Sequence, residues 1–69
     1  MKALYDKLTK QISKYEEIVD RRENIYYDRT YEWQESEKGQ DYEEKTELLQ
    51  EILSQMQELH EKIDEYLNF

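Results

Sequence analysis

The stretch Ser36-Glu37-Lys38-Gly39-Gln40-Asp41 decides the fold that this 69-residue sequence predicts. It contains the only glycine, and the chain has no proline. Apolar residues recur at helical spacing on both sides of it, so one helix breaker near the middle predicts two helices folded back on each other. Lys38 followed by Gly39 is typical of a helix C-terminus, with a cation in the last turn and a left-handed glycine beyond it. The fold is therefore expected to be all-α, an antiparallel two-helix coiled-coil hairpin. Its expected bounds within a single domain, 1–69, are 2–38 for the first helix, 39–41 for the turn and 42–68 for the second helix.

The second expected helix carries a continuous apolar seam. Its members alternate by three and four residues, as the a and d positions of heptads do. They are Tyr42, Lys45, Leu49, Ile52, Met56, Leu59, Ile63 and Tyr66, with Leu48, Leu53, His60 and Leu67 widening the stripe. Asp41 fits the N-cap of this helix, and Glu43 and Glu44 suit its positive N-terminus.

The first expected helix has a similar seam, interrupted by two arginines. Its members are Leu4, Leu8, Ile12, Tyr15, Val19, Arg22, Tyr26, Arg29 and Trp33. A turn at 39–41 predicts antiparallel partners whose numbers add up to about 80, which places Arg22 opposite residues 56–58. Residues 1–10 would then overhang the second helix. A single helical glycine costs only about 1 kcal/mol relative to alanine, so a continuous rod in a higher oligomer is the alternative.

The small size of the chain predicts a partner. A domain this short buries a limited fraction of its apolar surface and usually needs a staple. Without cysteine, and with one histidine, disulfides and zinc sites are not expected. Oligomerisation remains, so we expect a homodimer, with two hairpins forming a four-helix bundle, or an obligate partner. The residues expected to mediate it are Leu4, Leu8, Ile12, Arg22 and Arg29. For the two arginines, register control and contact with an anionic ligand both stay open.

Charge is abundant and unevenly distributed. The net charge is −8, and most carboxylates follow residue 36, whereas residues 1–14 hold four lysines and one aspartate. Such a field repels nucleic acid and attracts basic protein surfaces, so we expect a protein partner with a basic surface and no direct nucleic-acid contact. No apolar run is long enough for a membrane span, and the start lacks a signal-peptide core. The expected location is the cytoplasm, without membrane attachment.

Two groups of residues are candidates for partner binding. Glutamates at spacings of three and four form two trios on helix faces, and tyrosines cluster before the predicted turn. The candidates are Tyr27, Tyr31, Glu44, Glu47, Glu51, Glu58, Glu61 and Glu65. The glutamates are either the solvated face of an amphipathic helix or a row that imitates phosphates in a nucleic-acid-binding groove. The tyrosines fit either a dimer interface or a partner-binding patch.

Catalytic chemistry is not expected. His60 is the only residue that titrates naturally near neutral pH, with Glu61 and Asp64 close enough to orient its ring. No nucleophile–base pair, glycine-rich phosphate loop or metal-ligand cluster accompanies it. Gln57 stands where a di-iron Glu-x-x-His motif needs glutamate. We therefore predict no enzyme activity, no cofactor and no metal.

One stretch, Arg29 to Thr46, resembles a known pattern. It holds Trp33-Gln34-Glu35-Ser36-Glu37-Lys38-Gly39 after an arginine and before Tyr42 and an acidic helix. This arrangement is similar to that of short acidic proteins encoded by bacteriophages and prophages, and it covers about a quarter of the chain. The resemblance implies a bacterial host cell as the setting. By analogy it implies an inhibitor of a host enzyme or defence nuclease.

Two functions follow as expectations. The first is a small acidic binding module, a phage-encoded inhibitor that occupies a basic surface of a host nucleic-acid-handling or defence protein. The alternative is a structural coiled-coil protein that assembles a phage or mobile-element particle without inhibitory activity.

Overall fold

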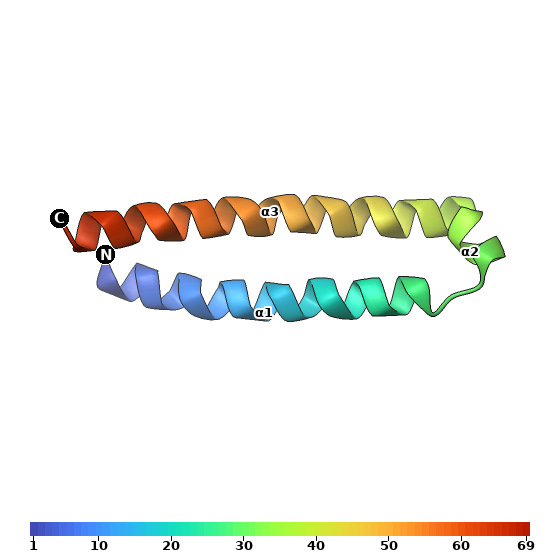
Figure 1. Cartoon of the computed structure of the whole chain (residues 1–69), viewed down its shortest axis with the longest axis horizontal. Helices are drawn as coiled ribbons and strands as arrows, with labels where there is room; N and C mark the ends of the chain where they lie inside the picture. Colours follow the sequence, from blue (N-terminus) through green and yellow to red (C-terminus); the bar gives the residue numbers. More distant parts are fainter.

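The computed structural model describes all residues, 1–69, as a helical hairpin. Its helices are α1 (Lys2–Tyr27), α2 (Tyr31–Glu35) and α3 (Glu37–Leu67). The long helices α1 and α3 run antiparallel side by side, α2 closes one end, and both termini lie at the other end (Figure 1). The molecule is a rod of 52 × 14 × 12 Å. The prediction of an all-helical fold with two long packed helices is confirmed.

The chain reverses over residues 28–36, which include α2, and the prediction of a turn at 39–41 is wrong. Helix α1 ends at Tyr27, and Thr30 adopts an extended conformation (ψ 155°) that starts α2. The Thr30 side chain accepts a hydrogen bond from the Trp33 amide at 3.2 Å, as an N-cap does. The Gln34 amide donates to the carbonyl oxygens of Tyr26 (2.9 Å) and Arg29 (3.3 Å). One side chain from α2 therefore bonds to a carbonyl of the last turn of α1 and to a carbonyl of the connection that follows it.

Gly39 lies inside the first turn of α3 and does not end a helix. Its φ is not positive, and its amide donates to the Oγ of Ser36, the N-cap of α3. A Cβ at this position would lie 2.1 Å from the Trp33 carbonyl oxygen and 2.8 Å from the Gln34 Cα. Glycine is therefore required because α2 and α3 approach each other at backbone distance. Asp41, the predicted N-cap, lies within α3.

The pairing of the two long helices is shifted from the predicted register. Arg22 contacts Thr46 rather than residues 56–58, and Thr9 contacts His60. The earlier turn is the cause, because it lengthens α3 toward its N-terminus and shortens α1. Residues 1–10 consequently pair with the end of α3 and do not overhang it.

The core is a thin seam between α1 and α3. Val19 and Ile63 are its buried apolar residues, and Thr46 is buried where Arg22 meets α3. The predicted seam of the first helix is confirmed from Leu8 to Tyr26, where every third or fourth residue is partly or fully buried.

The predicted seam of the second helix is half wrong. The structure uses residues 42, 46, 49, 53, 56, 60 and 63, so Leu53 and His60 face α1. Ile52 and Leu59 remain 45% and 49% exposed. Helix α3 carries two apolar stripes that share residues 42, 49, 56 and 63. The pairing with α1 covers only one of them.

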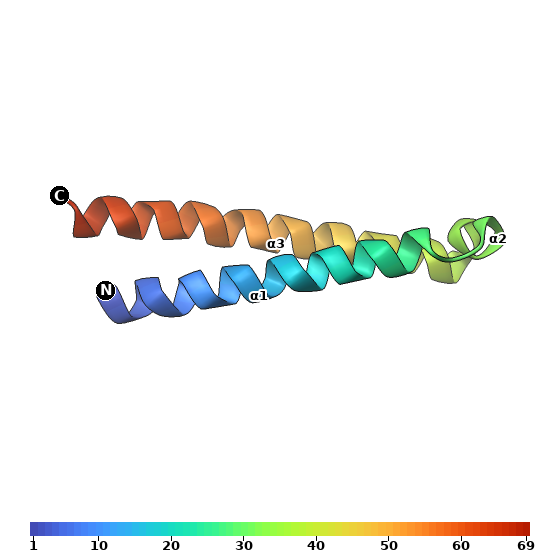
Figure 2. The ribbon, with the colours of Figure 1, turned by 60° about the horizontal axis from the view of Figure 1, so that its bottom comes forward.

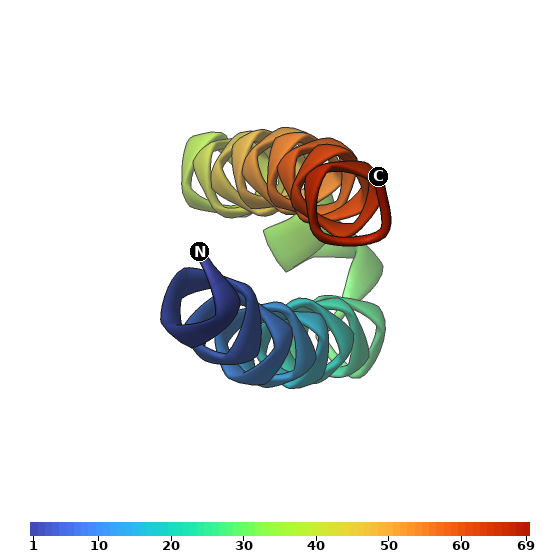
Figure 3. The same ribbon diagram turned by 90° about the vertical axis from the view of Figure 1, so that its left-hand side faces the viewer.

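The two long helices cross at an angle. The turned view and the end-on view show that α1 and α3 wrap around each other, with α2 bridging them at the far end (Figure 2; Figure 3). This is the arrangement that heptad seams produce. None of the three helices combines the length and the apolar composition that crossing a bilayer requires.

Candidate functional site

Six exposed glutamates form a row along the side of α3 that points away from α1. We call this row the acidic face; it consists of Glu44, Glu47, Glu51, Glu58, Glu61 and Glu65. The ion pair of the protein joins Lys2 and Asp6 at 3.4 Å, so no cation neutralises any of the six. At a helical rise of 1.5 Å per residue, the row extends over about 32 Å. The helix places every candidate glutamate on one surface, where a partner can reach it.

The two candidate tyrosines are separated by the turn. Tyr27, at the end of α1, is 72% exposed, and Tyr31, at the start of α2, is 75% exposed. Tyr27 lines a shallow pocket of about 170 Å³ together with Glu43 and Glu47. The structure therefore brings Tyr27 next to the acidic face, whereas Tyr31 does not line this pocket.

The other aromatic residues pack the turn end of the hairpin. Trp33 makes edge-on contacts with Tyr26 (centroids 6.1 Å apart) and Tyr42 (5.7 Å). These three rings come from α1, α2 and α3, so together they join the helices. A hydrogen bond with the Glu43 carboxylate, with desolvation and the Glu43 charge adding to it, raises the pKa of Tyr26.

Arg22 is held within the seam by neutral oxygens. Its Nε donates to Thr46 Oγ1 at 2.9 Å, and its Nη2 donates to the Tyr42 carbonyl at 3.1 Å. Its guanidinium also lies 4.0 Å from the centre of the Tyr42 ring. The predicted position of Arg22 opposite residues 56–58 is wrong, because the shifted register places it against Tyr42 and Thr46. This arginine carries its charge into the seam without a carboxylate partner.

The remaining residues expected to mediate oligomerisation lie at different depths. Leu8 and Ile12 are partly buried in the seam of the hairpin itself, and Leu4 is exposed. Arg29 lies on the turn with its guanidinium 4.3 Å from the Trp33 ring centre.

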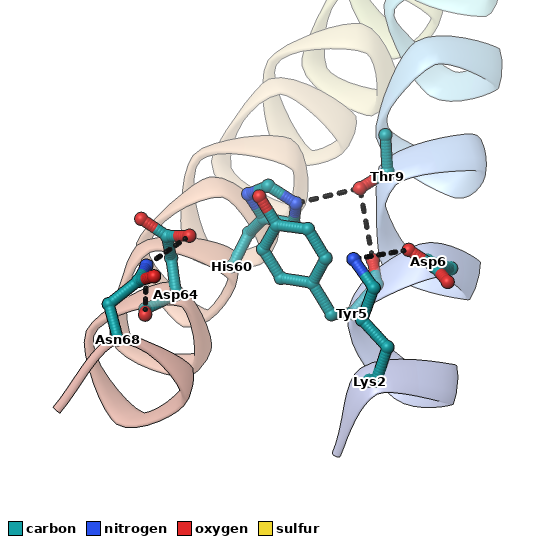
Figure 4. Close-up of polar contacts among 7 residues, drawn as sticks. All are labelled: Lys2, Tyr5, Asp6, Thr9, His60, Asp64 and Asn68. Atoms are coloured by element: carbon teal, nitrogen blue, oxygen red, sulfur yellow. Dashed lines mark hydrogen bonds and ion pairs between the residues drawn. The ribbon is translucent and has the colours of Figure 1, made fainter.

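A small polar cluster joins the two termini (Figure 4). Tyr5 stacks on His60 with ring centroids 4.2 Å apart, and His60 Nε2 lies 2.7 Å from Thr9 Oγ1. Because the Thr9 hydroxyl donates to the Tyr5 carbonyl, its oxygen accepts from the imidazole N–H. Asp64, which could have oriented His60, instead accepts from Asn68.

Sequence reasoning missed the polar bridges along one side of the seam. Gln57 donates to Glu16 at 3.2 Å, and Gln50 donates to Glu23. These residues are spaced by seven in both helices and flank the seam on one side. The signal in the sequence was this seven-residue spacing of polar side chains in both helices. It can be recognised only when the pairing register of the helices is known.

The geometry offers exposed charged and apolar surfaces for binding. No three of its His, Asp or Glu side chains come together as a metal site would require. Comparison with protein-family models, with curated proteins and with solved structures gave no match.

Proposed function

We propose that this chain is a small acidic protein-binding module that occupies a basic surface of its partner through the acidic face. The observation that carries the proposal is the row of six exposed glutamates without cationic partners on one rigid helix. A helix preorganises these charges, so little conformational freedom is lost when they meet lysines and arginines. The net charge of −8 adds long-range attraction toward a basic partner.

The charge density of the acidic face sets the strength of this interaction. Six carboxylates over about 32 Å give one charge per 6 Å, about half the density of a single DNA strand. The face is thus suited to a groove that normally neutralises phosphates, with a weaker dependence on salt than nucleic acid has. Tyr27, beside Glu47, supplies an aromatic contact at one end of the row.

The biological setting in this proposal comes from the resemblance to short acidic phage proteins. A phage-encoded inhibitor of a host nucleic-acid-handling or defence protein would act by covering the basic groove of its target. It would act in the bacterial cytoplasm, and neither a cofactor nor catalysis would be needed.

The test is capture of partners from bacterial lysate, followed by elution along a salt gradient. The wild-type chain is compared with a triple variant, Glu44→Gln, Glu47→Gln and Glu51→Gln. The control variant neutralises exposed carboxylates of α1, Glu17→Gln and Asp20→Asn. We expect a basic protein that is lost from the triple variant and retained by the control. Equal retention by both variants would contradict the proposal.

The assembly function is the second candidate, favoured by one observation. Leu48, Ile52 and Leu59 are exposed on α3, and a homodimeric four-helix bundle would bury them against a second copy. Sedimentation tests it, because a dimer has twice the mass of the 8.7 kDa chain. We favour the binding module because the exposed Lys45 and Lys62 lie on the same side of α3 as these residues, and a two-fold dimer through this side would bring like charges together.

A further inference from the structure

The two sides of the α1–α3 seam differ in chemistry. One side carries the bridges from Gln57 to Glu16 and from Gln50 to Glu23. On the other side, two rows of residues flank the seam, each at alternating spacings of three and four. They are residues 4, 7, 11, 14, 18, 21 and 25 of α1 and residues 45, 48, 52, 55, 59, 62 and 66 of α3. None of these positions holds aspartate or glutamate. We call this side the basic–apolar face.

The basic–apolar face combines exposed cations with exposed apolar side chains. Its cations are Lys7, Lys14, Arg21, Lys45 and Lys62. Its apolar members are the exposed Leu4, Ile25, Leu48, Ile52 and Leu59 and the half-buried Ile18. In a chain of net charge −8, these five cations are gathered on the one side from which carboxylates are missing. A surface that is only solvated does not require cations to be separated from carboxylates in this way.

On the basic–apolar face, apolar side chains of α1 and α3 together line a groove. It has a volume of about 220 Å³ and is lined by Ile18 of α1 and by Leu48, Leu49 and Ile52 of α3, with Arg22 and Lys45 beside them. Four of its six lining residues are therefore apolar and two are cationic. A concave apolar groove of this kind accepts the ridge of side chains on an amphipathic helix.

Arg22 links the groove to the seam. It donates from Nε and Nη2 to neutral oxygens and contacts no carboxylate. A guanidinium has five N–H donors, so this side chain keeps donors for an additional acceptor. A carboxylate that reaches the groove would supply the charge partner that the hairpin itself does not provide.

The charge pattern decides between possible occupants. A two-fold pairing of this face with a second copy would place the same five cations on both sides of the interface, with no carboxylate among them. Like charges across an interface oppose association. An amphipathic helix with an apolar stripe and acidic flanks complements both the groove and its cations.

We propose that the basic–apolar face binds an amphipathic helix of a partner protein whose apolar stripe is flanked by aspartate or glutamate. Apolar side chains of that helix enter between Ile18, Leu48 and Ile52, and its carboxylates meet Arg22 and Lys45. The acidic face lies on a different surface of the rod. The chain can thereby hold two partners of opposite charge.

Two labelled peptides test this proposal, each of about three heptads with leucine at the a and d positions. One carries glutamate at the flanking positions and the other carries lysine. Fluorescence anisotropy with the full chain is expected to give affinity for the glutamate peptide at least about tenfold higher than for the lysine peptide. Lys45→Glu is expected to reduce that preference, and Ile52→Ser is expected to weaken binding of the glutamate peptide by about tenfold.

Matched controls separate this site from the acidic face. Glu51→Gln and Glu58→Gln remove charge from the acidic face and are expected to leave peptide affinity within about twofold. Circular dichroism of every variant checks that the exposed substitutions preserve the helices.

Four results would overturn the proposal. Equal affinity for the two peptides would exclude recognition of an acidic helix. So would unchanged peptide binding in Lys45→Glu and also in Ile52→Ser. Sedimentation as a dimer that Ile52→Ser dissociates would assign the face to a second copy. If the chain floats with phosphatidylglycerol vesicles and these vesicles displace the bound peptide, the basic–apolar face would be assigned to a membrane surface.

Discussion

The two ends of the hairpin are closed in different ways. At the turn end, α2 and α3 meet at backbone distance around Gly39, aromatic rings from all three helices pack together, and Arg22 donates into the seam. At the terminal end, α1 and α3 meet through the buried Ile63, one ring stack and one side-chain hydrogen bond, the last two between Tyr5, Thr9 and His60. The fold is therefore fixed at the turn, and its stability is expected to decrease toward the termini.

Gly39→Ala tests the turn end most severely. Elsewhere in a helix this change stabilises by about 1 kcal/mol, because alanine is the better helix former. Here the added Cβ would collide with backbone atoms of Trp33 and Gln34, which cannot move aside as a flexible side chain would. We expect a loss of about 3 kcal/mol or more in the free energy of unfolding, measured by urea denaturation. Gln40→Ala, at the exposed neighbouring position, is the control, and a stabilised Gly39→Ala variant would refute the close approach.

Arg22→Met is expected to have the second largest effect. Methionine keeps much of the apolar stem but removes two hydrogen bonds and the contact with the Tyr42 ring. We expect a loss of about 2 kcal/mol in the free energy of unfolding. The neighbouring exposed Arg21→Met is expected to change it by no more than about 0.5 kcal/mol. If Arg22→Met were the more stable protein, burial of the guanidinium would cost more than its contacts return.

The same contrast explains what the sequence could predict. The seam of α1 follows from apolar spacing because that helix has one dominant stripe from Leu8 to Tyr26. In α3, Ile52 and Leu59 compete with Leu53 and His60 for the seam, and only the register set by the turn decides between them. Helical spacing also places the six glutamates on one surface, whatever the register.

The position of the turn could not be predicted from the single glycine, because it depends on helix caps and on contacts in the folded chain. A lone glycine predicts a helix end, but Gly39 instead permits the close approach of the consecutive helices α2 and α3, which only Ser36 separates. The real signals were Thr30 and Ser36, which cap α2 and α3. Gln34 adds a side-chain cap for α1 that only the folded arrangement reveals.

Tyr5→Ala tests the terminal end. It removes the stack on His60 while leaving the Thr9 hydroxyl in place. We expect a loss of about 1 kcal/mol, seen as faster amide hydrogen exchange in residues 2–9 and 60–67 and little change near the turn. Tyr66→Ala, an exposed tyrosine on the last turns of α3, is the control. Faster exchange along the entire molecule would contradict the difference between the two ends.

The smallest expected effect is a pH dependence that belongs to the turn end. Glu43 raises the pKa of Tyr26 in the folded chain above the ordinary value of 10.0, so the unfolded chain releases this proton first as the pH rises. The contribution to stability is therefore complete below pH 10 and is lost as the pH rises through the folded value. Between about pH 9 and pH 11, the melting temperature of Tyr26→Phe is expected to fall less steeply than that of the wild type. The exposed Tyr31→Phe serves as the control, and a slope as steep in Tyr26→Phe as in the wild type would show that this proton is not linked to folding.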